Sequence, residues 1–263
     1  MKKRQFLAFL GVFILSLSLV WGLGTDFFAQ SASAQSNNLT VSAAISMKDA
    51  LEEIKTAYQK KQPNMRITYN FGSSGSLQQQ IEQGAPVDVF ISAANKQMDA
   101  LEQKQLLLPG TRRNLVSNSI VLITPKNQQT VKTFQNLTNP QVKRIALGEP
   151  NTVPAGQYGQ QVLQYYKIFD SIKPKVIFGK DVRQVLTYVE TGNVDAGLVY
   201  STDARTSNQV RVAATAPNNS HQPIAYPIAV IKDSKNQAAA KAFAQYLATN
   251  EAKNTFKKYG FSV

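Results

Sequence analysis

Residues 69–77 read Tyr-Asn-Phe-Gly-Ser-Ser-Gly-Ser-Leu and join an apparent strand to an apparent helix through glycines and hydroxyl side chains. Glycine lets the backbone turn so that several N–H groups point the same way, and serine adds O–H donors. The first turn of the following helix adds unpaired N–H groups and a partial positive charge. The loop has no Lys or Arg and lacks the Gly-Lys-Ser/Thr ending of a P-loop, so a nucleotide is not the first candidate. A polar loop with a capped helix would look the same, so an anion site is indicated only if similar junctions recur.

Similar junctions do recur, because strand-like and helix-like segments alternate along the chain. The β-type runs are 39–45, 65–71, 87–92, 119–124, 144–149, 176–178, 194–200 and 223–231. Amphipathic patterns predict helices over 46–61, 95–104, 236–249 and 251–259, after the 69–77 loop, and after Pro154 and Asp181. This alternation predicts an α/β fold with mostly parallel sheets flanked by helices.

Several strand-to-helix junctions carry residues with two possible roles. Ser46, with Asp49 three residues later, fits a capping box, yet its hydroxyl could equally face a ligand at the end of the strand. Pro154 suits the first turn of a helix, which leaves the N–H of Ala155 as a free donor. Asp181 is predicted to be an N-cap, so a catalytic role is not needed to explain it.

The strand units form two successive sets with no Pro-, Gly- or Ser-rich linker between them. We therefore expect two lobes joined by crossing strands, with the ligand in the cleft outside the carboxyl ends of the strands. The first part of lobe 1 is assigned to residues 35–118 and lobe 2, including the crossing strands, to 119–231. The C-terminal helices in 232–263 are expected to return to lobe 1.

The N-terminus has the features of an export signal. Lys2, Lys3 and Arg4 precede an apolar run that begins at Phe6, and small residues then form an Ala-x-Ala site ending at Ala34. We predict a signal peptide over residues 1–34, cleaved after Ala34. The alternative is an uncleaved membrane anchor, since the apolar run is near the lower limit for a span.

Composition narrows the classes of function. The chain of 263 residues has a formal net charge of +13 and no cysteine, which excludes disulfides, thiolate metal sites and a Cys nucleophile. Lys and Arg are scattered rather than clustered with aromatic residues, which favours a solvated surface over nucleic-acid binding. His221, the only histidine, lies in a polar loop and is a poor candidate for a catalytic base. No metal-ligand cluster is visible, and no cofactor is predicted.

From residue 39 to the C-terminus the sequence resembles the periplasmic molybdate-binding proteins, the solute-binding subunits of molybdate ABC importers. The motifs that carry this resemblance are Ala-Ala-Ile-Ser at 43–46, Phe-Gly-Ser-Ser-Gly-Ser-Leu at 71–77, Gly-Ala-Pro-Val-Asp-Val-Phe-Ile-Ser-Ala at 84–93, Gly-Glu-Pro at 148–150, Val-Pro-Ala-Gly at 153–156, Asp-Val-Arg at 181–183, Gly-Leu-Val-Tyr at 197–200 and Lys-Lys-Tyr-Gly-Phe at 257–261.

The resemblance implies a two-lobed, type II-like periplasmic binding protein that is not an enzyme and that hands its ligand to ABC importer membrane subunits. It also implies that the oxyanion ligands are hydroxyls of Ser46, Ser74 and Tyr200 with backbone N–H groups of Ser46, Ser74, Ala155 and Val182. Ser73 fits the loop as well as Ser74, so that choice stays open. We expect a periplasmic monomer that binds no nucleic acid.

Physical chemistry fits that implied donor set. Molybdate is a tetrahedral dianion whose oxygens only accept hydrogen bonds, and hydroxyls with helix-start amides supply only donors. Tungstate is not distinguished from molybdate, and sulfate or thiosulfate remain alternatives. An exported serine hydrolase and a membrane-anchored anion sensor are the alternatives of another class. Glu149 is explained by its turn, and Arg183 is expected to be solvated or paired with a nearby carboxylate.

Overall fold

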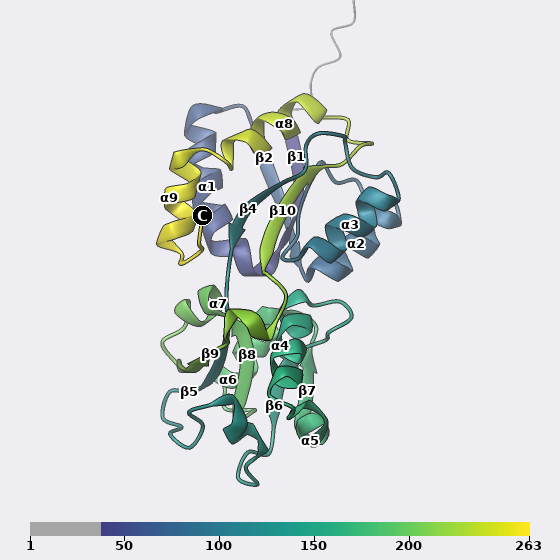
Figure 1. The fold of residues 1–263 in the computed structure, drawn as a ribbon. Helices are drawn as coiled ribbons and strands as arrows, with labels where there is room; N and C mark the ends of the chain where they lie inside the picture. The colour runs from purple at the N-terminus through teal and green to yellow at the C-terminus, as the bar shows by residue number, and fades with distance from the viewer. Residues whose placement is uncertain (1–37) are drawn as a thin grey trace, which may run out of the picture. The chain divides into compact units, whose positions relative to one another are not determined.

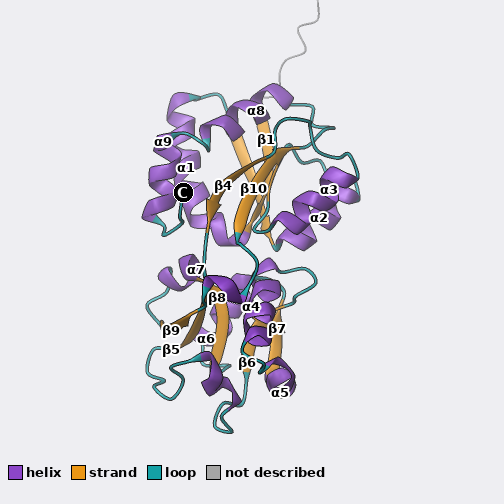
Figure 2. Ribbon diagram, viewed as in Figure 1, coloured by secondary structure: helices purple, strands orange, loops and turns teal. Residues whose placement is uncertain are grey.

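Helices and strands alternate over residues 38–263, the part that the computed structural model describes (Figures 1 and 2). This part belongs to one compact unit, Ser36–Val263. The strands are β1 (Asn38–Ala44), β2 (Arg66–Gly72), β3 (Val89–Ile91), β4 (Arg113–Ser117), β5 (Ile120–Pro125), β6 (Ile145–Gly148), β7 (Val176–Gly179), β8 (Ala196–Tyr200), β9 (Val210–Thr215) and β10 (Ala225–Val230). The helices are α1 (Lys48–Lys61), α2 (Ser74–Glu82), α3 (Asn95–Gln103), α4 (Pro154–Tyr165), α5 (Phe169–Ile172), α6 (Val182–Glu190), α7 (Ser201–Arg205), α8 (Gln237–Tyr246) and α9 (Asn250–Lys258).

The first sheet has the strand order β2-β1-β3-β10-β4 and forms the core of the first lobe. Strands β1, β2 and β3 run parallel, whereas β10 is antiparallel to both β3 and β4. Alternation along β3 sends Phe90 into the apolar cluster of α2 and α3, while Val89 and Ile91 join the cluster on the other face. Helices therefore cover both faces of this sheet (Figure 2). The C-terminal helices pack here, with α9 against α1 and α8 against β10.

The second sheet has the order β7-β6-β8-β5-β9 and forms the core of the second lobe. Strand β6 runs parallel to β7 and β8, and β5 is antiparallel to β8 and β9. Helices α4 and α6 both pack on the central strands β6 and β8. The chain enters this lobe between β4 and β5 and leaves it before β10, as Figure 1 shows.

The two-lobed α/β architecture predicted from the sequence is confirmed, with two corrections. Both sheets are mixed rather than mostly parallel, and β10, assigned to the second lobe within 119–231, pairs in the first sheet. The apolar pattern of β10 predicts a strand but not its partner, because pairing is set by residues far away in the sequence. Strands β4 and β9 were not predicted.

The predicted signal peptide, residues 1–34, lies outside the described residues. Among residues 38–263, no helix is both long enough and apolar enough to cross a membrane.

Candidate functional site

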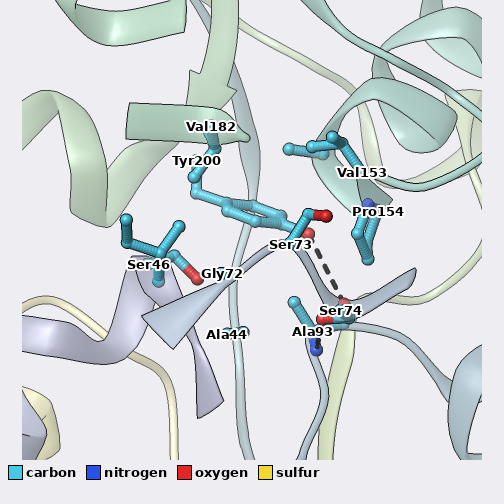
Figure 3. Close-up of a pocket in the computed structure, with 12 residues that line it drawn as sticks. Ala44, Ser46, Gly72, Ser73, Ser74, Ala93, Val153, Pro154, Val182 and Tyr200 are labelled. Atoms are coloured by element: carbon cyan, nitrogen blue, oxygen red, sulfur yellow. Dashed lines mark hydrogen bonds between the residues drawn. The ribbon is translucent and has the colours of Figure 1, made fainter. Parts of the chain in front are cut away.

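A small cavity lies where the strand-to-helix junctions of the two lobes meet (Figure 3). It has a volume of about 10 Å³, room for about one water molecule. The first lobe lines it with Ala44, Ile45, Ser46, Gly72, Ser73, Ser74 and Ala93, and the second with Val153, Pro154, Ala155, Val182 and Tyr200. The structure thus brings together all five residues predicted from the sequence, and also Ser73.

The two neighbouring serines of the glycine-rich loop differ in their hydrogen bonds. The Ser73 hydroxyl donates to Ser76 Oγ at 2.8 Å, and its oxygen caps α2 by accepting from the Ser76 N–H. The Ser74 oxygen instead accepts from the Ala93 N–H at 2.9 Å, which leaves its own hydrogen available. This pattern favours Ser74 over Ser73 as a donor toward the cavity.

Ser46 is held by a chain of hydrogen bonds instead of capping its helix. It lies in a single 3-10 turn, Ile45–Met47, and α1 begins after Met47 without a side-chain cap, so the predicted capping box is wrong. Its Oγ lies 3.0 Å from the Tyr226 hydroxyl, which accepts from Asn118 Nδ2 at 3.2 Å. Asn118 Oδ1 accepts from the Ser119 N–H and the Ser201 hydroxyl, which fixes the amide orientation.

The chain from Asn118 therefore sets the direction of each hydrogen bond. With Asn118 donating to Tyr226, the Tyr226 O–H is left to donate to Ser46, whose own hydrogen then faces the cavity. Sequence reasoning missed Tyr226 and Asn118. Their local pattern, a buried strand and a turn, gives no signal of a bond that spans 180 residues between Ser46 and Tyr226.

Tyr200 enters the cavity from the end of β8, as predicted (Figure 3). Its hydroxyl donates to the carbonyl of Ala93 at 3.4 Å, a long bond that a better acceptor can replace. Burial raises the pKa of Tyr200 well above its ordinary value, and the neighbouring Tyr226, Tyr158 and Asp203 raise it further. Burial also raises the pKa of Tyr226. Both phenols therefore remain O–H donors at any physiological pH.

Backbone N–H groups at three helix starts border the same cavity. Ser74, Ala155 and Val182 each lie in the first turn of α2, α4 and α6, where an amide has no acceptor within its helix. Pro154 opens α4 and Asp181 caps α6 by accepting from the Gln184 N–H at 2.9 Å, both as predicted. These helix starts give the cavity a positive potential without a cation.

A close approach of backbone places the start of α4 at the cavity. A Cβ on Gly156 would lie 1.9 Å from the carbonyl oxygen of Gly148, the last residue of β6. Only glycine at 156 lets α4 begin directly against the end of that strand. This packing brings Ala155 to the cavity wall.

No charged side chain occurs among the lining residues in the described part of the chain. Arg183, beside Val182, points elsewhere: its Nη2 contacts Asp49 at 2.5 Å and its Nε contacts Asp203 at 2.6 Å. Burial lowers the pKa of Arg183, but Asp203 and Asp49 outweigh that effect, so its pKa is raised overall. The expectation that Arg183 pairs with a carboxylate is confirmed.

The side chains considered above as a catalytic acid or base lie away from this cavity. His221 Nδ1 bonds the carbonyl of its neighbour Gln222, and Glu149 accepts from Asn151, and none of these residues lines the cavity. Over residues 38–263, no group of three His, Cys, Asp or Glu residues is placed to hold a metal ion.

The fold and the site together define a class. Two α/β lobes joined by two crossing segments, with a donor-rich cavity between strand ends, are the architecture of a solute-binding protein. Residues 39–262 match the family model described as bacterial extracellular solute-binding protein. The chain belongs to this family.

Similar proteins support the assignment. YvgL of Bacillus subtilis, named as an ABC transporter substrate-binding lipoprotein, is 48% identical over 85% of this chain and 86% of its own length. The molybdate-binding protein ModA of Escherichia coli is 39% identical over 94% of this chain and 98% of its own. The solved structure of the Azotobacter vinelandii periplasmic molybdate-binding protein shares the fold, with a TM-score of 0.77 at 24% identity, covering 86% of this chain and 99% of that one. Such proteins are solute-binding transport proteins, not enzymes, and carry no cofactor.

Proposed function

We propose that this protein captures molybdate, and tungstate with it, in the cavity between its lobes and delivers the anion to an ABC importer. The observation that carries the proposal is the lining itself: hydroxyls, helix-start amides and apolar groups, with no acidic or basic side chain among them. Such a lining offers hydrogen-bond donors that suit an anion with acceptors only.

The protonation state of the ligand separates it from other oxyanions. Monohydrogen phosphate has a proton to donate and is best matched by a carboxylate acceptor, which the lining lacks in the described residues. A bare dianion matches every donor. Hydrogen bonds to a charged group are each worth about 1.5–3 kcal/mol, so several together offset the cost of removing the dianion from water. The Ser46, Ser74 and Tyr200 hydroxyls and the amides of Ser46, Ser74, Ala155 and Val182 are the proposed donors.

Membership of the extracellular solute-binding family supports delivery of the anion to an importer. The protein works outside the cytoplasmic membrane, in the periplasm after cleavage at Ala34, as a monomer that docks on the importer's membrane subunits. Closure of the lobes about the crossing segments surrounds the anion. Because the cavity is small, the lobes must open again before an anion can enter. We expect the liganded pocket to fit molybdate, so that sulfate, the main alternative, would leave its donors stretched because it is smaller.

Calorimetric titration with molybdate, tungstate and sulfate tests this function on the exported protein. Ser74→Ala and Tyr200→Phe should each weaken molybdate binding by about 10- to 100-fold, the equivalent of one hydrogen bond to a charged group. Binding of sulfate alone would assign the protein to sulfur uptake. Absence of heat with every oxyanion would contradict the proposal.

Ser73→Ala is the matched control for Ser74→Ala. Because Ser73 caps α2, this change should lower the free energy of unfolding by about 1 kcal/mol while affinity changes little. The reverse pattern, with affinity lost in Ser73→Ala and kept in Ser74→Ala, would transfer the ligand role to Ser73.

A further inference from the structure

Besides the Tyr200–Ala93 hydrogen bond inside the cavity, a contact between the lobes lies on each side of it. On one side the Gly75 N–H donates to the carbonyl of Thr152 at 2.9 Å. On the other, Arg183 in α6 reaches Asp49 in α1. Each contact borders residues of the site: Gly75 follows Ser74, and Arg183 follows Val182.

Arg183 is anchored within its own lobe. Its Nε bonds Asp203, whose side chain is fully buried in α7, and its Nη1 lies 3.4 Å from Thr206 Oγ1. Asp203 and Thr206 belong to the same lobe as α6, so these bonds are kept whatever the distance between the lobes. They fix the guanidinium so that Nη2 extends toward the first lobe.

Asp49 is the part of this arrangement that depends on lobe closure. It lies in the first turn of α1, three residues after Ser46, and its side chain is 39% exposed even when paired. When the lobes separate, Asp49 returns to water and Arg183 keeps only its partners in the second lobe. The Asp49–Arg183 pair therefore contributes to the closed state alone.

We propose that Asp49 and Arg183 form a latch that stabilises the closed state around the bound anion and sets the rate at which the anion leaves. This inference rests on the proposed function. A contact present only in the closed state raises the population of that state, and apparent affinity rises in proportion to the competent population. Asp49 and Arg183 act on closure without touching the anion, so they are positioning residues.

Asp49→Asn tests the latch, and Glu53→Gln is its matched control. Glu53 lies one turn further along α1, is similarly exposed at 38%, and pairs with Lys258 at 2.6 Å within the first lobe. Both variants remove one carboxylate charge and one ion pair from the same helix. Only Asp49→Asn removes a contact between lobes. Arg183 is left unchanged because its loss would leave the buried Asp203 carboxylate without its ion-pair partner.

The readouts are molybdate affinity by calorimetry, release of radioactive molybdate into excess unlabelled anion, and the radius of gyration by X-ray scattering, all on the exported protein. Asp49→Asn should weaken binding by about three- to fivefold, mostly through faster release, as expected for a partly exposed ion pair. The ligand-saturated variant should be less compact than wild type, and the difference in affinity should shrink at high salt. Glu53→Gln should stay within about twofold of wild type.

Equal affinity and release rate in Asp49→Asn and Glu53→Gln would overturn the latch, because the inter-lobe pair would then contribute nothing. Tighter binding in Asp49→Asn would also overturn it and would mean that the freed Arg183 acts on the anion as a counter-charge. Failure of the proposed function looks different: wild type itself then binds no molybdate, and the latch fails with it.

Discussion

Ser46 depends on a residue that does not line the cavity. Tyr226 donates to it from the first sheet and is itself held by Asn118, at the crossing between β4 and β5. A hydroxyl that receives a hydrogen bond from a fixed donor has a preferred direction for its own hydrogen. The orientation of a proposed anion donor is thus set by a tyrosine whose hydroxyl is buried behind it.

Tyr226→Phe removes that donor. We expect molybdate affinity to fall by about fivefold and the free energy of unfolding to fall by about 1–2 kcal/mol, since Asn118 loses a buried acceptor. Tyr69→Phe is the control, because the Tyr69 hydroxyl donates to the Leu51 carbonyl and neither residue lines the cavity. Calorimetry and urea unfolding measure both effects. Unchanged affinity in Tyr226→Phe would mean that Ser46 does not need this partner.

Asp203 gives the protein a dependence of stability on pH. Burial, opposed by Arg183 and reinforced by Asp49, raises the pKa of Asp203 from 3.8 to about 6. The folded chain then holds this proton more tightly than the unfolded chain does. The contribution to stability is fully present below pH 3.8 and is lost as pH rises through about 6.

Urea unfolding of wild type and Asp203→Asn across this pH range tests whether stability falls as pH rises. Relative to the variant, the free energy of unfolding of wild type should fall between about pH 4 and 6, by at most about 1.4 kcal/mol per pH unit, and level off above. Parallel curves for the two proteins would show that Asp203 has an ordinary pKa in the folded state.

At the scale of elements, the start of α2 lies against the loop before α4 in the other lobe. A Cβ on Gly75 would come within 2.6 Å of the backbone of Thr152, although Gly75 itself is an ordinary helical residue. Close contact between these elements is thus possible only because residue 75 has no side chain.

Gly75→Ala should affect stability and binding in opposite directions. Alanine favours a helix over glycine by about 1 kcal/mol, so the free energy of unfolding of the unliganded protein should stay equal or rise. Molybdate affinity should fall by more than about tenfold, because the lobes can no longer close fully. Gln79→Ala, an exposed change in the same helix, should leave affinity unchanged. Wild-type affinity in Gly75→Ala would contradict the closed contact.

Helices and their starts could be predicted from local sequence, whereas strand pairing could not. Pro154 and Asp181 are recognisable because proline and an N-cap act within one turn. Strand β4, with the sequence Arg-Asn-Leu-Val-Ser, is short and half polar, and only its pairing with β10 makes it a strand.

The residues of the candidate site also divide into those that local sequence predicts and those that depend on distant contacts. Four of the five predicted residues follow a strand and Tyr200 is the last residue of one, and the rule that ligands lie at the carboxyl ends of strands predicts that they meet. Tyr226 and Asn118 could not be predicted, because their role depends on contacts between segments far apart in the sequence. Local sequence also gives Ser46 a capping role that the longer-range bond to Tyr226 replaces.

At the scale of the whole molecule, an anion that contacts both lobes should stabilise them together. A ligand at about 100 times its dissociation constant raises the free energy of unfolding by about 2.7 kcal/mol. Molybdate should therefore raise the midpoint of thermal unfolding in a single transition, and equal concentrations of sulfate or phosphate should not. Two transitions, of which molybdate shifts only one, would mean that the anion contacts a single lobe.

The central claim is that the cavity selects a bare tetrahedral dianion of the size of molybdate, and equilibrium dialysis in a mixture tests it most directly. The exported protein is dialysed against molybdate with a large excess of sulfate and phosphate. The molybdenum and phosphorus retained per chain are determined by elemental analysis, and the retained sulfate by ion chromatography. The account predicts one molybdenum per protein and no excess of sulfate or phosphate inside the bag. Retention of sulfate or phosphate in place of molybdenum would contradict it.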